Sequence, residues 1–281
     1  MEIFNLIGVV FNTLFFAPIV NLLILVYKVL ESISFPGALG FAILALTIFI
    51  RLLVWPFYGA QLKSAHKMAK LKPHLSVLKE KHKGDKKAFA EAQMALFKEH
   101  GVNPAAGCLP TLIQIPIFFA LYQAIANVFP GAVAGFSGSL AGINSVLYHP
   151  WLHLLATPDA NFFSLNLAVK PSQYGFASLF ILIPLVTAAL TFLQSKMMIT
   201  PQPQGEKSKD KKSGGMEDTM SSMQSQMAYL MPLMIGYFAF QFPVGLAIYW
   251  NAFTIMGIIQ QYKISGWGGA EGLWKNNLVK H

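Results

Sequence analysis

The stretch TIFIRLLVWP, residues Thr47–Pro56, contains one arginine inside a run that is otherwise almost wholly apolar. Between Gly37 and Phe57, Arg51 is the only charged residue. A central arginine raises the free energy of inserting a helix into a membrane by about 2.5–3.5 kcal/mol, and by less near the helix end. Its long side chain could extend to the headgroups from there, so position alone leaves two interpretations open: a snorkelling arginine or a functional one.

The composition is that of an integral membrane protein. Of 281 residues, 54% are hydrophobic and only 12% are charged, whereas a soluble domain carries about 25% charged residues. The single cysteine, Cys108, excludes an intramolecular disulfide and a cysteine-cluster metal site. The sequence also has no phosphate-binding loop, which argues against an ATPase. We therefore expect no cofactor, no metal and no enzymatic activity.

Apolar runs of about 18 residues or more are candidate transmembrane helices. The last such run, Met227–Tyr262, is too long for one helix and contains Gln241–Gly245, a Pro- and Gly-bearing sequence that predicts a tight turn. The fold class predicted is an all-α integral membrane protein with a bundle of five transmembrane helices. The predicted spans are 37–58, 104–129, 174–197, 227–241 and 245–263.

The lysines predict the orientation, because cytoplasmic loops are enriched in Lys and Arg. The segment 59–103 holds ten lysines against four acidic residues, and Lys196–Gln226 holds five more lysines, whereas 130–173 holds only Lys170. We therefore expect 59–103, the linker 198–226 and the tail 264–281 to be cytoplasmic. The segment 130–173 is expected to be an outer loop, with the N-terminus outside and the C-terminus inside.

The N-terminal segment 1–36 is apolar, but Pro18 is expected to break it. Beyond Pro18 the segment is weakly amphipathic, so we prefer an interfacial helix on the outer surface. The alternative is a sixth span, which would place the N-terminus inside. In the segment 59–103, apolar residues recur at helical spacing on either side of a Gly-Asp turn. This pattern predicts an antiparallel helical hairpin, either a merely solvated basic loop or a docking surface for lipid headgroups or partners.

Polar residues within the predicted spans form one narrow stripe in each of four helices. In lipid such groups turn toward one another or toward water, so they predict a partly hydrated cavity with Arg51 on its wall. The bland alternative is interhelical hydrogen bonding that only holds the bundle together. No Asp or Glu lies in any of the five spans. The stripe comprises Thr47 and Arg51, then Thr111 and Gln114, then Thr187, Thr191 and Gln194, and finally Asn251 with Thr254.

Four stretches resemble the YidC/Oxa/Alb family of membrane protein insertases. TIFIRLLVWPFYGAQLKSAHKMAKLKP is similar to the family's first core helix, with its groove arginine and the start of its basic hairpin. LFKEHGVNPAAGCLPTLIQIPIFFALYQAI resembles the second helix, and WLHLLATPD an outer segment. MPLMIGYFAFQFPVGLAIYWNAFTIMGIIQQY resembles the closing helix pair. Together they cover most of residues 37–263, and the lack of a large outer domain resembles the short bacterial form.

The resemblance implies an insertase that works without nucleotide chemistry. Its members hold the hydrophilic tail of a nascent protein in a groove open to the cytoplasm, while the hydrophobic segment moves sideways into the bilayer. By resemblance, Arg51 is the groove arginine, and Gln114, Trp250, Asn251 and Gln194 are groove residues. The implied partners are nascent membrane proteins and the lipid bilayer, with the ribosome and the Sec translocon as candidates and no direct nucleic-acid readout. The implied location is the bacterial plasma (inner) membrane.

Three rival interpretations have weaker support in the sequence. A polar-solute transporter could use the same cavity, but we find no inverted repeat. The motif Gly135–Gly138 matches a rhomboid-like Gly-x-Ser-Gly around Ser137, but a serine nucleophile also needs a base in reach. His149 and His153 could bind a metal, yet beyond Asp159 no further ligand is evident.

A stripe of methionines precedes and enters the fourth predicted span. It is either core packing or an adaptable surface for apolar client segments. The stripe comprises Met216, Met220, Met223, Met227, Met231 and Met234.

Overall fold

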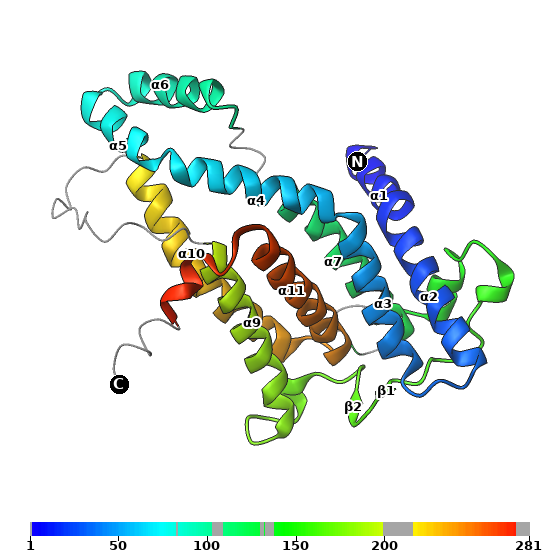
Figure 1. Ribbon diagram of the computed structural model, residues 1–281. Helices are drawn as coiled ribbons and strands as arrows, with labels where there is room; N and C mark the ends of the chain where they lie inside the picture. The colour runs from blue at the N-terminus through cyan, green and yellow to red at the C-terminus, as the bar shows by residue number, and fades with distance from the viewer. Residues whose placement is uncertain are drawn as a thin grey trace. The chain divides into compact units, whose positions relative to one another are not determined.

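The computed structural model describes residues 2–82, 84–102, 109–129, 132, 138–198 and 216–273, and it is mostly helical (Figure 1). The chain divides into two compact units, which are described separately. The first unit comprises Met1–Leu53, Thr111–Thr191 and Pro232–Met256. The second unit comprises Val54–Pro110, Phe192–Met231 and Gly257–His281.

Eleven α-helices and several short elements make up the described residues. The α-helices are α1 Glu2–Phe11, α2 Ala17–Ser32, α3 Ala38–Leu53, α4 Trp55–Lys70, α5 Lys72–Lys81, α6 Lys86–Glu99, α7 Leu109–Val128, α8 Leu140–Asn144, α9 Leu182–Met198, α10 Met216–Gln241 and α11 Val244–Ser265. The short elements are the π-helix η1 Asn12–Phe16, the 3₁₀ turns η3 Pro150–Leu152, η4 Pro171–Gln173, η5 Leu179–Ile181 and η6 Gly268–Ala270, and the strands β1 Asn161–Phe162 and β2 Leu165–Asn166.

The N-terminal helix is continuous, which corrects the prediction that Pro18 breaks it. Pro18 lies in the first turn of α2, directly after the π-helical turn η1. Proline cannot donate the usual helical hydrogen bond and its ring crowds the preceding turn. A π-helical turn shifts the hydrogen-bond ladder at that point, so the chain passes the proline without ending the helix. The helix Phe4–Ser32 has 29 residues and a mean hydropathy of 2.3, which is long and apolar enough to cross a membrane.

Helix α2 packs against α3 in the first unit (Figure 1). Val20 and Ile24 of α2 are fully buried, as are Ala42 and Leu46 of α3, and all four belong to the main hydrophobic core. By contrast, α1 exposes several large apolar side chains, Phe4 among them at 80%. Whether α1 and α2 cross the bilayer or lie at its outer surface stays open between the two interpretations drawn from the sequence.

The helices that meet a strict length and hydropathy test for a membrane span are fewer than predicted. Among the described residues, Phe4–Ser32 and Leu179–Met198 pass alone, and Ala38–Leu53 passes only together with Trp55–Ser64, from which it is bent by 55°, as a broken span or a re-entrant loop. The apolar helices Gln114–Val128 and Ala228–Gln241 are shorter than the test requires. The chain is therefore a mostly helical membrane protein, and the count of five spans remains a prediction.

The third predicted span begins later than expected. Tyr174–Ser178 is not helical, and α9 starts at Leu182 after the turn η5, whose first residues are capped by the Ser178 side chain accepting from the Phe180 N–H at 3.2 Å. The prediction of a helix from residue 174 was therefore wrong. Apolar content alone marks residues as buried in protein or lipid, whereas a serine that caps a turn decides where the helix begins.

The segment 138–173, which was predicted to be an outer loop, contains structure that the sequence did not predict. Strands β1 and β2 pair antiparallel, with Asn161 opposite Asn166. The side chain of Asn21 on α2 donates to the Val146 carbonyl at 2.8 Å and accepts from the Tyr148 N–H at 2.7 Å. This pair of hydrogen bonds ties the described part of segment 131–149 to the N-terminal helix.

The tight turn between α10 and α11 is held by the same loop. Helix α10 ends at Gln241, and α11 begins at Val244 after Pro243. The first N–H groups of a helix have no partner within the helix. Here the N–H of Val244 donates to the Val169 carbonyl and that of Gly245 to the Leu167 carbonyl, each at 2.9 Å. The segment that holds Leu167 and Val169 therefore fixes the position at which α11 begins.

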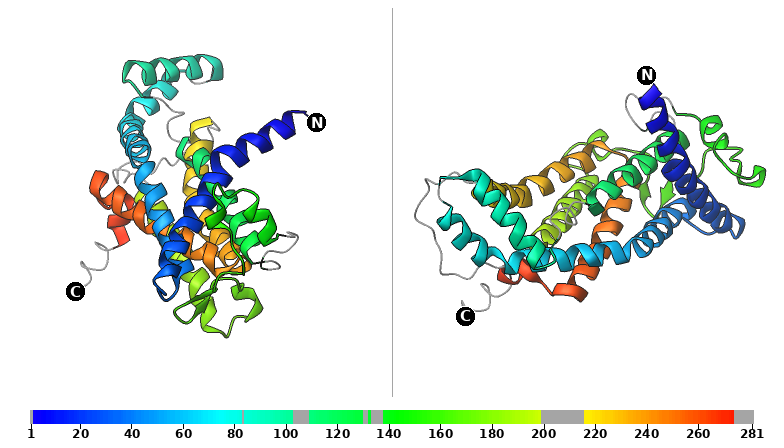
Figure 2. Two further views of the ribbon diagram at one scale, coloured as in Figure 1. Left: turned by 90° about the vertical axis from the view of Figure 1, so that its right-hand side faces the viewer. Right: turned by 90° about the horizontal axis from the view of Figure 1, so that it is seen from above.

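The second unit has a small core of its own. Leu71 and Leu75 pack against Phe97 and Val102, which brings α5 and α6 together (Figure 2). Asp85 caps α6 by accepting from the N–H groups of residues 87 and 88 at 3.0 Å. The basic hairpin predicted over 59–103 is thus helical, in three helices rather than two, and its placement in the cytoplasm remains a prediction.

Candidate functional site

Helix α3 buries its one charge beside apolar core residues and exposes other large apolar side chains. Arg51 is 2% exposed and Thr47 is fully buried, whereas Phe49 and Leu53 are 52% and 65% exposed. In a soluble protein a charged residue is almost never fully buried unless it is paired. Charged residues in membrane helices turn toward the protein interior because lipid cannot solvate them. The burial of Arg51 argues against the interpretation in which it extends outward to the headgroups.

The guanidinium of Arg51 lies over an aromatic ring. Its Cζ atom is 4.3 Å from the centroid of the Phe253 ring on α11. Such cation–π contacts contribute about 0.5–2 kcal/mol, the larger value where water is excluded. Phe253 is in turn 6.0 Å, between ring centroids, from Tyr249 one helical turn earlier. Sequence reasoning missed Phe253, since an aromatic residue in a transmembrane helix gives no sign of a cation partner.

A second polar contact joins α7 to α11. The Gln114 amide donates a hydrogen bond to the hydroxyl of Tyr249, a residue that is fully buried. A buried tyrosine hydroxyl usually has such a partner, because leaving it without one is costly. Nothing in the sequence indicated a role for Tyr249, which the structure joins to the predicted site residue Gln114.

The threonines of α9 form a third group with Trp250. Thr187 and Thr191 each donate to the carbonyl four residues earlier, at 2.8 Å, and Thr47 on α3 does the same at 2.6 Å. The Trp250 indole N–H donates to the Thr191 hydroxyl at 3.4 Å. These hydroxyls therefore have hydrogen-bond partners within the protein. This agrees with the alternative interpretation, in which such hydrogen bonds serve only to hold the bundle together.

The remaining predicted site residues fall into different surroundings. Asn251 is half-buried, and its buried Oδ1 accepts no hydrogen bond from the described residues. Gln194 belongs to the second unit, which is described separately from the first. Thr111 lies in α7, but its side chain is outside what the structure describes. Of the methionine stripe, Met231 and Met234 are 37% and 41% exposed rather than buried in a core.

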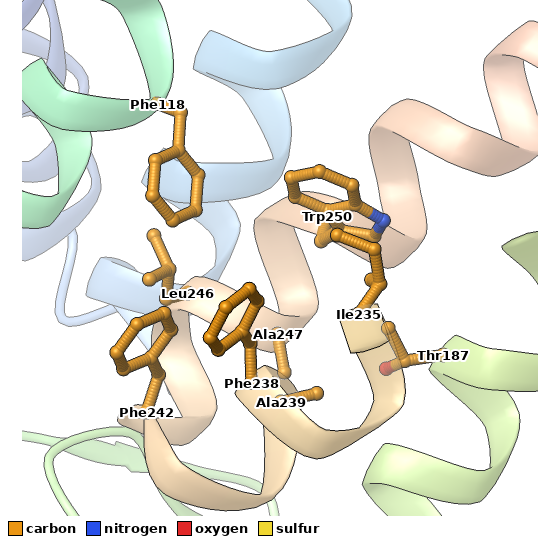
Figure 3. A pocket seen from close by; sticks show the side chains of 9 residues that line it. All are labelled: Phe118, Thr187, Ile235, Phe238, Ala239, Phe242, Leu246, Ala247 and Trp250. Atoms are coloured by element: carbon orange, nitrogen blue, oxygen red, sulfur yellow. The ribbon is translucent and has the colours of Figure 1, made fainter. Parts of the chain in front are cut away.

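An apolar pocket lies beside the Trp250 group (Figure 3). It holds about 300 Å³ of space, part of it open to the surroundings, between α7, α9, α10 and α11. The rings of Phe238 and Phe242 stack with centroids 5.6 Å apart, and Phe118 meets Trp250 edge-on at 5.8 Å. Its lining is almost entirely carbon, so this pocket is a different feature from the hydrophilic cavity expected from the sequence, which stays a prediction.

The rival sites gain no support from the described residues. Within them, no group of three His, Cys, Asp or Glu side chains is placed to hold a metal ion. The Nδ1 atom of His149 accepts from the Trp151 N–H at 3.3 Å, which caps the turn η3. Ser137 of the protease-like motif lies outside the described residues.

The chain is similar to a known family of membrane proteins. Residues 30–268 match the protein family described as 60Kd inner membrane protein. The chain belongs to this family, the YidC/Oxa/Alb family. The matched range includes the helices that carry Arg51, Gln114 and Trp250, so the whole candidate site lies within it.

Similar curated proteins carry the name membrane protein insertase YidC. The one from Nitratidesulfovibrio vulgaris strain DP4 is 34% identical over 88% of this chain and 38% of its own length. Those from Cupriavidus metallidurans and Rickettsia rickettsii are 30% and 33% identical, each over 83% of this chain, and over 33% and 36% of their own lengths. The chain thus spans about a third of the length of these relatives. Family membership and the apolar helices indicate a multi-pass protein of the bacterial inner membrane.

Proposed function

We propose that this chain is a membrane protein insertase. It receives nascent membrane proteins at a hydrophilic groove open to the cytoplasm and releases their hydrophobic segments sideways into the bilayer. The observation that carries the proposal is the burial of Arg51 on α3 between exposed apolar neighbours, in a family whose relatives are named insertases. A buried cation is costly in an apolar protein, so its presence requires a use.

The proposed role of the buried Arg51 follows from electrostatics. Charge interactions are stronger where water is scarce, because the effective dielectric constant is low. Arg51, with the amides of Gln114 and Asn251 on neighbouring helices, forms a transient polar binding site for an acidic client tail inside the membrane. The exchange must stay weak, since a client held tightly would not be released. A single cation among neutral amides meets that requirement better than a cage of ion pairs.

The proposed architecture completes this mechanism. Five spans enclose the groove, with the N-terminal helix at the outer side and the basic hairpin of α4 to α6 in the cytoplasm. The hairpin attracts anionic headgroups and arriving clients through its lysines. The chain acts without cofactor or metal and catalyses no bond chemistry. Nascent chains and lipid are its partners, and the ribosome and the Sec translocon are candidate partners on the cytoplasmic side.

Site-specific photocrosslinking tests the proposal. A photoreactive amino acid replaces Gln114 or Thr191, and a ribosome-stalled client with an acidic translocated tail is presented to the protein in proteoliposomes. We expect crosslinks from both positions to the client tail. Phe4 is the matched control, because it is 80% exposed on α1 and belongs to the same unit. A photoreactive residue there should give no crosslink to the tail.

The opposite result would point to another function. If Gln114 and Thr191 give no more crosslinks than Phe4 while the proteoliposomes take up a polar solute, the chain is a transporter and the insertase proposal is wrong. Client insertion measured by protease protection in the same proteoliposomes separates the two functions directly.

A further inference from the structure

Arg51 and Phe253 form the cation–π contact found among the described residues of the first unit. The guanidinium lies over the Phe253 ring, with 4.3 Å between Cζ and the ring centroid. Arg51 itself is 2% exposed, so water contributes little to its solvation at this place. The face of a benzene ring carries a partial negative charge and attracts a cation without bearing a charge of its own.

The position of the ring is fixed by residues other than Arg51. Phe253 is half-buried and packs against the main hydrophobic core. It follows Tyr249 by one turn of α11, with 6.0 Å between their ring centroids, and Tyr249 is in turn held by the Gln114 amide. The ring therefore presents a preformed surface on which the guanidinium rests. α11 places Tyr249 and Phe253 on one side, so one helix positions both the amide and the cation of the site.

A ring suits this place better than a carboxylate would. A buried Arg–carboxylate pair is held by a strong charge interaction, and breaking it leaves a buried charge uncompensated. A cation–π contact is weaker and involves the face of the ring, whereas a carboxylate binds the N–H fork of a guanidinium, so an arriving carboxylate can bind while the ring contact is kept. The ring thus holds the cation in place both before and during the binding of an acidic client.

We propose that Phe253 is a positioning residue, which holds the Arg51 guanidinium by a cation–π contact and thereby sets how well the protein captures acidic client segments. This inference rests on the proposed function. The substrate class that it concerns is polypeptide tails bearing Asp, Glu or a terminal carboxylate. Tails without such groups should be insensitive to the ring.

Stepwise fluorination of the ring is the sharpest test. Mono-, di- and trifluorophenylalanine at position 253 keep the shape of the ring and remove its negative face in steps. We expect insertion of an acidic-tail client to fall in the same order, by about five- to thirty-fold for the trifluoro variant, the range that corresponds to loss of a buried cation–π contact. Insertion of a client with a neutral tail should stay unchanged. Phe253→Tyr should retain activity, since its ring also attracts cations.

Two controls separate positioning from packing. The same fluorinated series at Phe118, whose ring meets Tyr122, Phe242 and Trp250, should leave acidic-tail insertion unchanged. In an Arg51→Gln background, fluorination of Phe253 should have no effect on insertion. Equal losses in the two backgrounds would overturn the proposal, because they would show that fluorine disturbs packing rather than the cation.

A measurement independent of insertion distinguishes failure of this inference from failure of the proposed function. Fluorination of Phe253 should lower the thermal unfolding midpoint of the purified protein when Arg51 is present and not in the Arg51→Gln background. Coupling in that double-mutant cycle supports the cation–π contact even if the chain proves not to be an insertase. Absence of coupling overturns it, and coupling without any effect on acidic clients overturns the role in capture.

Discussion

The two units treat positive charge in opposite ways. In the first unit, Arg51 is 2% exposed and lies over an aromatic ring inside the protein. In the second, Lys63, Lys67 and Lys70 all lie exposed along α4, at spacings that place them on one face. The first unit buries one cation at a defined place, while its Lys28 and Lys170 are only half-buried, and the second unit displays many cations on its surface. The surroundings of a positive charge, buried over a ring or exposed on a helix, therefore matter more for its role than the number of such charges.

The same contrast holds for packing. The first unit is organised around a large core in which polar groups have specific partners. One example, called the Asn21 clamp, is the Asn21 side chain, which bonds to the Val146 carbonyl and the Tyr148 N–H. The second unit is described with a core of four buried side chains, Leu71, Leu75, Phe97 and Val102. Substitutions of single polar residues should therefore have large effects in the first unit and small effects in the second.

Removal of the charge at Arg51 should have the largest effect. Hydrogen bonds to a charged group contribute about 1.5–3 kcal/mol. We therefore expect Arg51→Gln to lower insertion of acidic-tail clients roughly 10- to 100-fold, measured by protease protection in proteoliposomes. Arg51→Lys keeps the charge and should retain most of the activity. Equal loss in both variants, or equal loss for neutral tails, would contradict the assignment of Arg51 as an acceptor of acidic tails.

Loss of the clamp at Asn21 should have the next largest effect, and on stability rather than client choice. Asn21→Leu leaves the Val146 carbonyl and the Tyr148 N–H without their partner. Both hydrogen bonds are partly buried, so each group left unsatisfied costs about 1 kcal/mol, the low end of the range for buried groups. The thermal unfolding midpoint in detergent should fall by several degrees. Asn12→Leu is the matched control, because Asn12 is exposed on the same helix. A similar fall in that control would show that the clamp is not the cause.

The sequence predicted the parts of this molecule that depend on local pattern. Apolar runs marked the helices, and the sequence Phe242-Pro243 marked the turn before α11, because proline cannot continue a hydrogen-bonded helix. The one charge between Gly37 and Phe57 indicated Arg51 as a candidate functional residue. Each of these inferences uses information contained within a few neighbouring residues.

The features that the sequence did not predict depend on contacts between distant segments. Asn21 forms hydrogen bonds with Val146 and Tyr148, which lie 125 and 127 positions later in the sequence. No local sequence pattern around Asn21 predicts those bonds. Nothing in the sequence distinguishes Phe253 from other aromatic residues of the helix, and only the structure shows Arg51 over its ring. Pro18 was expected to break a helix that accommodates it through a π-helical turn. A proline restricts the backbone, but the surrounding turn decides how that restriction is met.

Filling the space beside Gly40 should have a moderate effect. A Cβ atom added at Gly40 of α3 would stand 2.1 Å from the Phe162 ring of β1, so the ring must move. Phe162 is only 9% exposed, which limits its freedom. Overpacking of this kind costs about 1–3 kcal/mol, partly offset in Gly40→Ala by the better helix propensity of alanine. Thermal unfolding should show a net loss, whereas Gly8→Ala on α1, with no atom within 4 Å of the added Cβ, should gain stability.

Neutralising exposed lysines of the second unit should have the smallest effect. Lys63→Gln, Lys67→Gln and Lys70→Gln together remove three charges from one face of α4 without touching the described core. Each lysine near an anionic membrane contributes about 1 kcal/mol of attraction, which salt screens. The triple variant should insert clients within about twofold of wild type and unfold at the same temperature. A fluorophore at Val77, which is 68% exposed on α5, should report weaker energy transfer to labelled headgroups in anionic nanodiscs but not in neutral ones. If the variant loses insertion as severely as Arg51→Gln, the second unit also uses its charges one by one, and the contrast between the two units does not hold.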